Sequence, residues 1–164
     1  MTLSQSQAIH KLRELHDLKC LMRDGIELST DVYMPATGGP FPTLLMRTPY
    51  DNHDGAGVLP DAIYQAQRGY AVVVQDVRGW YDSPGDWYPF INEANDGHDA
   101  IEWAAKQPWS TGKVGTIGKL LLRAYTVAGR PGEQLPPDCL GTQGRLLKCL
   151  PQLGLYRRGL SAGF

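Results

Sequence analysis

Hydrophobic and polar residues alternate along residues 26–33. A period of two is typical of a strand that buries one face. Asp24 and Gly25 precede this segment and are residues that hairpin turns favour, so residues 18–22 are the expected partner strand. The pattern therefore predicts an antiparallel hairpin near the start of the chain.

Two short, continuous apolar runs come next, at residues 43–46 and 71–74. Runs of this kind are buried on both faces in parallel sheets. Between them, residues 59–68 carry apolar side chains at helical spacing, and Gly69 follows as a C-cap. These segments predict a strand, a helix and a second strand.

Residues 96–107 have a helical pattern as well, with alanines on the apolar face and Pro108 after the last turn. Asp96 and Asp99 fall near the start, where the helix dipole favours acidic side chains. Residues 113–118 form a short strand pattern that leads into a glycine turn. The whole order predicts an α/β fold, in which an antiparallel hairpin precedes a mostly parallel sheet with flanking helices.

Composition narrows the classes of protein to which the chain can belong. It has 164 residues, 42% of them hydrophobic, and a net charge of −1. This is enough for one core of ordinary size and gives no reason to expect nucleic acid or an anionic membrane as a partner. Polar residues interrupt the first 15 positions, so we expect no signal peptide or membrane span there and a cytoplasmic location. The oligomeric state stays open.

The three cysteines, Cys20, Cys139 and Cys149, have neither C-x-x-C spacing nor a nearby histidine. The odd number argues against a disulfide framework, and the spacing argues against a zinc site. We therefore expect free thiols, no cofactor and no metal.

The sequence changes in character after residue 119. Residues 1–119 carry 10 basic and 15 acidic residues, whereas residues 120–164 carry 6 and 2, and proline and glycine become frequent. Such a density of proline and glycine interrupts regular elements. We expect residues 1–119 to belong to the α/β domain and residues 120–164 to form a tail of low order.

Four segments are similar to motifs of the Xaa-Pro dipeptidyl-peptidase and cocaine-esterase family of α/β-hydrolases, and they occur in the family's order. The similarity extends over roughly residues 15–119, and the segments are Met22-Arg23-Asp24-Gly25 with Asp31-Val32-Tyr33, Arg47-Thr48-Pro49-Tyr50, Gln75-Asp76-Val77-Arg78-Gly79, and Gln107-Pro108-Trp109-Ser110 with Gly112-Lys113-Val114-Gly115. The resemblance implies part of an α/β-hydrolase fold. It also implies a serine hydrolase that cleaves small-molecule esters, or peptides after proline, through an acyl-enzyme.

The resemblance gives Tyr50 a catalytic role. In such esterases the tyrosine of the Pro-Tyr pair donates its hydroxyl to the oxyanion of the tetrahedral intermediate, together with a backbone N–H after the nucleophile. Taken as a residue by itself, Tyr50 is more consistent with a tyrosine packed in a bend, with its hydroxyl satisfied by the backbone. The family context favours the oxyanion role.

The nucleophile of the family is missing from this sequence. The family motif reads Gly-x-Ser-Tyr-x-Gly, whereas residues 118–123 read Gly-Lys-Leu-Leu-Leu-Arg, so that Leu120 occupies the serine position. After Leu120 there is no histidine, and Glu133 and Asp138 are the two acidic residues. A serine triad needs an acid and a histidine after the serine in this fold. We therefore expect this chain to be inactive.

A shift of reading frame near Lys119 would account for the leucines, the basic tail and the stop together. Leucine codons read one base later can encode serine or tyrosine, and Arg123 can become glycine, which would restore the family's motif. The alternative is a divergent domain without catalysis that has a genuine apolar turn at residues 120–122. The competing function is then a non-enzymatic one, either a truncated fragment or a binding module that uses the basic tail.

Several other polar and aromatic residues invite a functional interpretation. Asp76 and Arg78 follow a buried strand, and we interpret them as a structural ion pair or hydrogen-bond hub rather than as acid and base. An aromatic loop can either line an acyl pocket or pack over the sheet, and its members are Trp80, Tyr81, Trp87, Tyr88 and Phe90. Residues 112–118 match no nucleotide-binding motif.

The histidines have no nucleophile at motif spacing. His53 lies between Asp51 and Asp54 in a loop, and we expect a solvated loop histidine rather than a metal ligand or general base. His98 is expected at the surface or half buried on the second helix. His10 and His16 fall in the N-terminal region, for which the sequence indicates no role.

Overall fold

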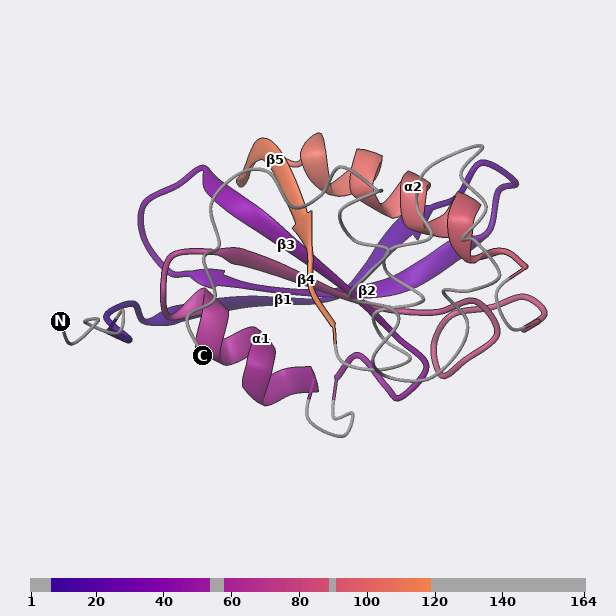
Figure 1. Cartoon of the computed structure of the whole chain (residues 1–164), viewed down its shortest axis with the longest axis horizontal. Coiled ribbons are helices and arrows are strands. Elements are labelled where there is room, and N and C mark those ends of the chain that lie inside the picture. The colour runs from indigo at the N-terminus through magenta and orange to yellow at the C-terminus, as the bar shows by residue number, and fades with distance from the viewer. Residues whose placement is uncertain (1–6, 54–57, 89–90, 119–164) are drawn as a thin grey trace, which may run out of the picture. The chain divides into compact units, whose positions relative to one another are not determined.

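The computed structural model describes residues 7–53, 58–88 and 91–118. In chain order the described elements are β1 (Leu12–Leu21), β2 (Glu27–Pro35), β3 (Phe41–Thr48), α1 (Val58–Ala66), β4 (Ala71–Asp76), α2 (Glu93–Ala105) and β5 (Ser110–Thr116). The strands form one sheet in the order β1-β2-β4-β3-β5 (Figure 1). The pairs β1–β2 and β2–β4 are antiparallel, whereas β3 is parallel to both β4 and β5. The predicted α/β fold, with its opening hairpin and parallel strands, is confirmed.

Most element boundaries differ from the predictions by a few residues, and the starts of β1 and α2 differ for a clear structural reason. β1 begins at Leu12 rather than near Leu18, because a bulge between Leu15 and Leu18 interrupts the period of two that would reveal the strand. α2 begins at Glu93 rather than at Asp96. Its first turn has buried acidic side chains, so the hydrophobic pattern alone does not show where the helix starts.

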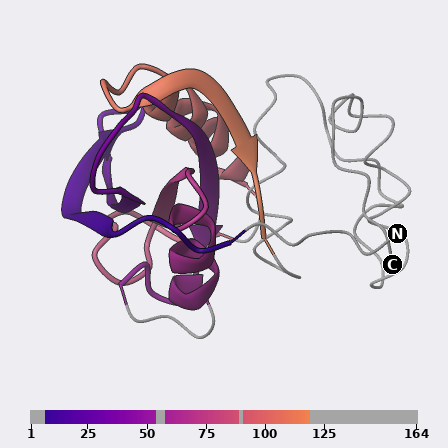
Figure 2. The same ribbon diagram turned by 90° about the vertical axis from the view of Figure 1, so that its left-hand side faces the viewer.

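The helices cover opposite faces of the sheet. Figure 1 shows α1 below the strands and α2 above them, and the view in Figure 2 keeps the helices on separate sides. The core under α2 includes Leu28, Val32, Leu45, Val73, Ala100 and Ala104. The core under α1 includes Tyr33, Met46, Val72, Val74, Ala62 and Ala66. Successive residues of β4 enter opposite cores, which explains why its sequence is apolar throughout.

The carboxyl ends of the parallel strands meet at one edge of the sheet. Thr48 at the end of β3 is opposite Asp76 at the end of β4, and Leu45 is opposite Thr116 at the end of β5. Loops that leave this edge are where open α/β sheets bind ligands. The fold therefore directs attention to the loops that follow β3, β4 and β5.

The predicted tail, residues 120–164, lies outside the described residues, and so does Leu120. Cys139, Cys149, Glu133 and Asp138 lie there too. Within the described ranges, neither helix has the length and apolar character needed to cross a membrane.

Candidate active site

Tyr50 follows β3 at the carboxyl edge of the sheet. Its backbone N–H donates a hydrogen bond to Thr48 Oγ1 at 2.9 Å, which turns the chain sharply after the strand. The next residue, Asp51, has a φ of +76° and continues the bend. The side chain of Tyr50 is 42% exposed, and among the described residues its hydroxyl has no hydrogen-bond partner. The tyrosine is therefore not packed with a satisfied hydroxyl.

β5 lies directly beside β3 and runs in the same direction. The backbone N–H of Ile117 donates to the carbonyl of Leu45 at 3.0 Å, so the pairing continues to the end of β5. The segment that leads toward residue 120 thus leaves the sheet next to the strand that precedes Tyr50. Adjacent parallel strands are the arrangement that an oxyanion hole shared between these two loops requires.

A buried arginine lies below the Tyr50 turn on the α2 face. Arg47 is fully buried, and its guanidinium donates to Gln75 Oε1 at 2.8 Å and to Glu93 Oε2 at 2.5 Å. Burial raises the pKa of Glu93, and Arg47 opposes this rise. The pair joins β3 to the first turn of α2. The hydrophobic pattern does not predict this pair, although arginine inside an apolar strand is itself a signal that an acid must lie opposite.

Arg78 is the hub of a second group of charges. It binds Asp96 through two nitrogens, at 2.7 and 3.1 Å, and Asp24 of the hairpin turn at 2.6 Å. These hydrogen bonds to Asp96 and Asp24 raise the pKa of Arg78 further above its usual value, although burial opposes the rise. Arg78 therefore connects the β4–α2 loop, α2 and the hairpin, as expected for a structural hub.

The expected pairing of Arg78 with Asp76 is wrong. Asp76 is fully buried on the α1 face, and neither carboxylate oxygen makes a hydrogen bond among the described residues. Burial raises the pKa of Asp76 to about 7, with a further rise from the Asp51 carboxylate. The backbone N–H groups of Asn52 and Asp82 approach the carboxylate without reaching hydrogen-bond geometry and lower the pKa only in part. β4 ends at Asp76, so Arg78 lies in the loop after the strand, where its guanidinium reaches Asp96 of α2.

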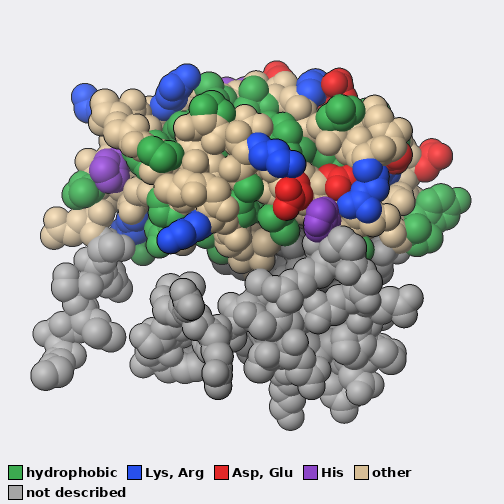
Figure 3. Space-filling view, turned by 90° about the horizontal axis from the view of Figure 1, so that it is seen from above, with side chains coloured by type: hydrophobic (Ala, Val, Ile, Leu, Met, Phe, Trp, Pro, Cys, Tyr) green, Lys and Arg blue, Asp and Glu red, His purple; other side chains and the backbone are tan. Residues whose placement is uncertain are grey.

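The exposed part of the charge network lies at the hairpin turn. Arg23 donates to both carboxylate oxygens of Asp99 and to Asn95 Oδ1. The hydrogen bonds from Arg23 lower the pKa of Asp99 to about 2. The contact with Arg23 therefore accounts for the position of Asp99, and the helix dipole does not. In Figure 3 acidic and basic side chains lie next to one another on this face of the molecule.

The β4–α2 loop is fixed by small residues. Ser83 Oγ accepts the Ser29 N–H and donates to the Asp76 carbonyl, each at 2.9 Å. Gly79 has a φ of +74°, and a Cβ there would lie 2.6 Å from the Trp87 nitrogen. Glycine is therefore required at this position.

The comparison with known proteins agrees with these observations. The sequence matches the X-Pro dipeptidyl-peptidase (S15 family) over residues 24–120, which is more than half of the chain. The chain belongs to this family. The four motif segments lie in the matched region or directly before it, and the described contacts show that most of their charged residues hold the hairpin, β3, β4 and α2 together.

Three relatives illustrate the family. A cocaine esterase from Rhodococcus sp. (strain MB1 Bresler) is 39% identical over 100 residues, which are 59% of this chain and 17% of the esterase. A CocE/NonD family hydrolase from Staphylococcus aureus superimposes with a TM-score of 0.62 and 27% identity, over 70% of this chain and 24% of that protein. An α-amino acid ester hydrolase has a TM-score of 0.61 and 27% identity, over 78% and 24%. The chain thus matches less than a quarter of the length of each of these relatives.

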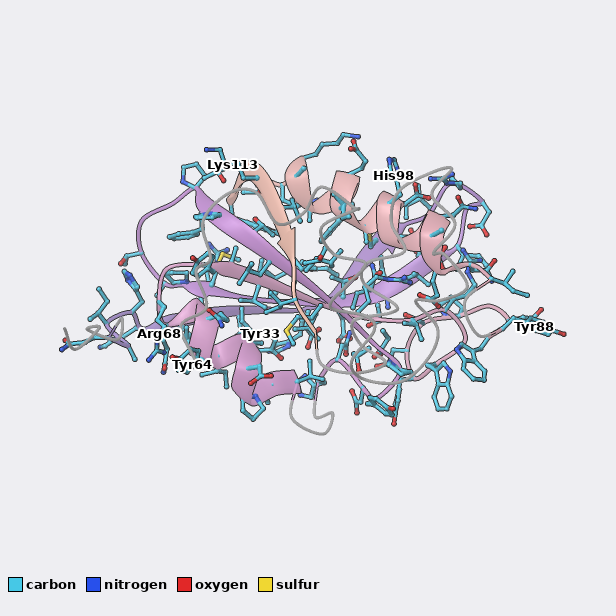
Figure 4. The ribbon with its side chains drawn as sticks, in the orientation of Figure 1. Tyr33, Tyr64, Arg68, Tyr88, His98 and Lys113 are labelled. Atoms are coloured by element: carbon cyan, nitrogen blue, oxygen red, sulfur yellow. The ribbon has the colours of Figure 1, made fainter. Side chains whose placement is uncertain are left out.

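The aromatic loop of this family member packs partly on itself. The rings of Trp80 and Trp87 are 5.4 Å apart and nearly perpendicular, and Tyr81 lies 6.1 Å from Trp80. Tyr88 extends into solvent, as Figure 4 shows, and Phe90 lies outside the described residues. A pocket of about 440 Å³ lies at the opposite edge of the sheet, lined by residues such as Met34, Phe41 and Trp109, and does not include this loop or Tyr50. Whether the loop lines an acyl pocket stays a prediction.

The histidines differ in their surroundings. His98 is partly exposed beside Arg23 and Asp99, as expected. His53 is exposed, as expected for a loop histidine, but its Nδ1 lies 3.2 Å from the buried carboxylate of Asp31. His16 Nδ1 lies 2.8 Å from the same oxygen, and this contact raises the pKa of His16. No local sequence pattern connects these residues, because they lie on three separate segments of the chain.

Proposed function

We propose that this chain supplies the oxyanion side of a serine hydrolase site, with Tyr50 as the side-chain donor. The observation that carries the proposal is the position of Tyr50. Its hydroxyl is exposed at the end of β3, has no partner among the described residues, and lies beside the parallel strand that leads to the nucleophile position.

The role assigned to Tyr50 is to donate a hydrogen bond from its hydroxyl without transferring the proton. When a serine oxygen attacks the carbonyl carbon of an ester or amide, the carbonyl oxygen gains negative charge. The Tyr50 hydroxyl donates a hydrogen bond to that oxygen and keeps its proton, while a backbone N–H after the nucleophile donates the second. Loss of one such donor typically lowers kcat by about 10² to 10³.

We further propose that this chain has no serine-hydrolase turnover of its own. Leu120 has no nucleophilic atom, and no histidine follows it in the sequence. An unassisted serine hydroxyl is a weak nucleophile at neutral pH, so a single Leu120→Ser change would not restore the reaction. Arg123 in place of the motif glycine would also disturb the tight turn.

The proposed substrates are those of the family, small-molecule esters or peptides cleaved after proline. The choice between them depends on pockets formed by parts of the longer relatives that this chain does not match. A cytoplasmic location is part of the same proposal, and the buried free thiol of Cys20 is compatible with it.

The test is hydrolysis of p-nitrophenyl acetate and of an Xaa-Pro anilide by three proteins. These are the present chain, its Leu120→Ser variant and a frame-restored protein that encodes the serine motif and continues beyond it. We expect saturable turnover with the frame-restored protein alone. Comparable turnover by either short chain would contradict the proposal.

The role of Tyr50 is tested in the frame-restored protein. Tyr50→Phe should lower kcat by about 10² to 10³ with a much smaller change in KM, because the hydrogen bond forms mainly in the transition state. Tyr64→Phe is the matched control, since Tyr64 is similarly exposed but lies on α1 with Arg68 stacked over its ring (Figure 4). Equal kcat values for the two variants would show that Tyr50 is not the oxyanion donor.

A further inference from the structure

Two histidines and a buried carboxylate converge on the α1 face of the sheet. His16 Nδ1 and His53 Nδ1 lie 2.8 and 3.2 Å from the same oxygen, Asp31 Oδ2. One potential ligand atom from each residue lies within 4.8 Å of the others. The three residues come from β1, from β2 and from the loop after β3, so the fold brings together groups that are distant in sequence.

The bulge in β1 is what directs His16 toward this point. Leu15 is opposite Val32 and Leu18 is opposite Thr30, so His16 and Asp17 together face Asp31 alone. Bulges re-aim side chains and are common beside functional sites. On the other side, the His53 N–H donates to Asp51 Oδ1 at 2.9 Å, which turns the loop back toward the sheet.

Asp31 is a buried acidic side chain, and among the described residues its ion-pair partners are both histidines. Its side chain is 2% exposed, and among the described residues no lysine or arginine forms an ion pair with it. Its Oδ1 accepts the Asp17 N–H at 3.0 Å, and the Tyr33 hydroxyl lies 3.4 Å from Oδ2. Tyr33 lies between the sheet and α1 (Figure 4). A carboxylate in such a position needs a cation beside it.

The spacing of the three groups suits a small divalent ion. With metal–ligand bonds of about 2.0 to 2.1 Å, neighbouring ligand atoms in a tetrahedral site are about 3.3 Å apart. The contact of His53 with Asp31 is already at this spacing, and that of His16 needs to open by a few tenths of an ångström. The ligand atoms of the two histidines lie within 4.8 Å of each other, so the exposed ring of His53 has to move toward His16 when the ion binds. The exposed sides of His16 and His53 leave room for a water ligand.

Glu14 adds the outer contact that ligating histidines usually have. Its Oε2 lies 3.3 Å from Nε2 of His16, on the other side of the ring from Asp31. A carboxylate at this place accepts the Nε2–H and leaves the Nδ1 lone pair free to bind a cation. Imidazole nitrogens with one carboxylate favour zinc and related transition metals over calcium or magnesium.

We propose that His16, Asp31 and His53 form a binding site for a divalent transition-metal ion such as Zn²⁺, which clasps the Tyr50 loop to the β1–β2 hairpin. His53 lies three residues after Tyr50, so an ion bound here fixes the segment that positions the Tyr50 hydroxyl. The site stands on its own contacts and does not depend on the proposed catalytic role of Tyr50.

The test is calorimetric titration of the metal-stripped full chain with Zn²⁺. Cys139 and Cys149 are replaced by serine in every protein, so that thiolate binding in the tail does not contribute. We expect one ion per chain, and His16→Ala and His53→Ala should each weaken binding at least about ten-fold. His98→Ala is the matched control, because His98 also lies beside a carboxylate, Asp99, and should leave binding unchanged.

Three results would overturn the proposal. One is the absence of Zn²⁺ binding, another is unchanged affinity in the His16→Ala/His53→Ala double variant, and the third is Ca²⁺ binding as tight as that of Zn²⁺. Both histidines are exposed at the surface, so these variants should fold, and circular dichroism checks that they do.

Hydrogen exchange tests the clasp itself. Zn²⁺ should slow amide exchange of residues 50–53 in the parent protein and leave it unchanged in His53→Ala. If Zn²⁺ binds but amide exchange of residues 50–53 is not slowed, the ion does not fix the Tyr50 loop, and the proposal as stated is refuted.

Discussion

Asp76 is the residue whose ionisation has the clearest predicted effect on stability. Its pKa is about 7 in the folded chain against an ordinary value of 3.8, so the folded state holds a proton that the unfolded state has lost between these values. The folded chain therefore loses stability as the pH rises from about 4 to about 7, and the loss is complete above this range. A shift of this size corresponds to about 4 kcal/mol.

Asp76→Asn removes the titrating group and should abolish this loss. We expect the variant to be more stable than the parent chain at pH 8, by up to about 4 kcal/mol, and nearly equal to it at pH 4. Urea denaturation at a series of pH values measures the difference. Asp86→Asn is the control, because Asp86 is exposed and should show little difference at either pH. A constant difference across the series would refute this account of Asp76.

At the scale of single residues, some contacts could be predicted from the sequence and others could not. The hub role of Arg78 could be predicted, because an arginine directly after a buried strand needs acidic partners. Its partners could not, since Asp24 and Asp96 lie on other elements. The approach of His16 to Asp31 depends on a bulge, and a bulge leaves no sign in the sequence apart from a broken alternation.

At the scale of elements, the Arg47–Glu93 pair fixes α2 against β3. Arg47→Met leaves Glu93 buried without its cation, and removing one partner of a buried pair typically costs about 3 to 5 kcal/mol. The free energy of unfolding in urea should fall by that amount. Arg23→Ala, which breaks a more exposed pair with Asp99, should lower the free energy of unfolding much less. If the two variants lose equal stability, the buried pair has no special role.

The order of elements could be predicted because the apolar runs and helical faces are clear. The boundaries could not, because polar groups replace apolar ones where α2 starts and where β1 bends. Glu93 is buried where it pairs with Arg47, which lies 46 residues earlier in the sequence. A pattern of neighbouring residues cannot predict such a contact. Tertiary contacts of this kind override the local pattern.

At the scale of the whole molecule, we predict that the outer edge of β5 promotes self-association. β5 ends the sheet order, and among the described residues it pairs with β3 alone. Unpaired strand edges template further pairing. We expect concentration-dependent association in sedimentation velocity experiments.

The N–H of Thr116 points away from β3. Successive N–H groups of a strand point to opposite sides, and the N–H of the next residue, Ile117, bonds to β3.

The variant Thr116→Pro removes this outward donor and should reduce the association, since edge strands tolerate proline. The change leaves the Ile117 contact with β3 in place. A parent chain that stays monomeric at all concentrations, with a sharp cooperative melt, would show that the β5 edge is not an association site.

The central claim is that the chain contains the oxyanion side of a serine hydrolase without an activated nucleophile. Labelling with a fluorophosphonate, followed by intact mass measurement, tests it most directly, because the probe forms a covalent bond with an activated serine. The frame-restored protein provides the positive control. We predict no mass increase for the present chain. Stoichiometric labelling of it on a single serine, lost on denaturation, would contradict the account.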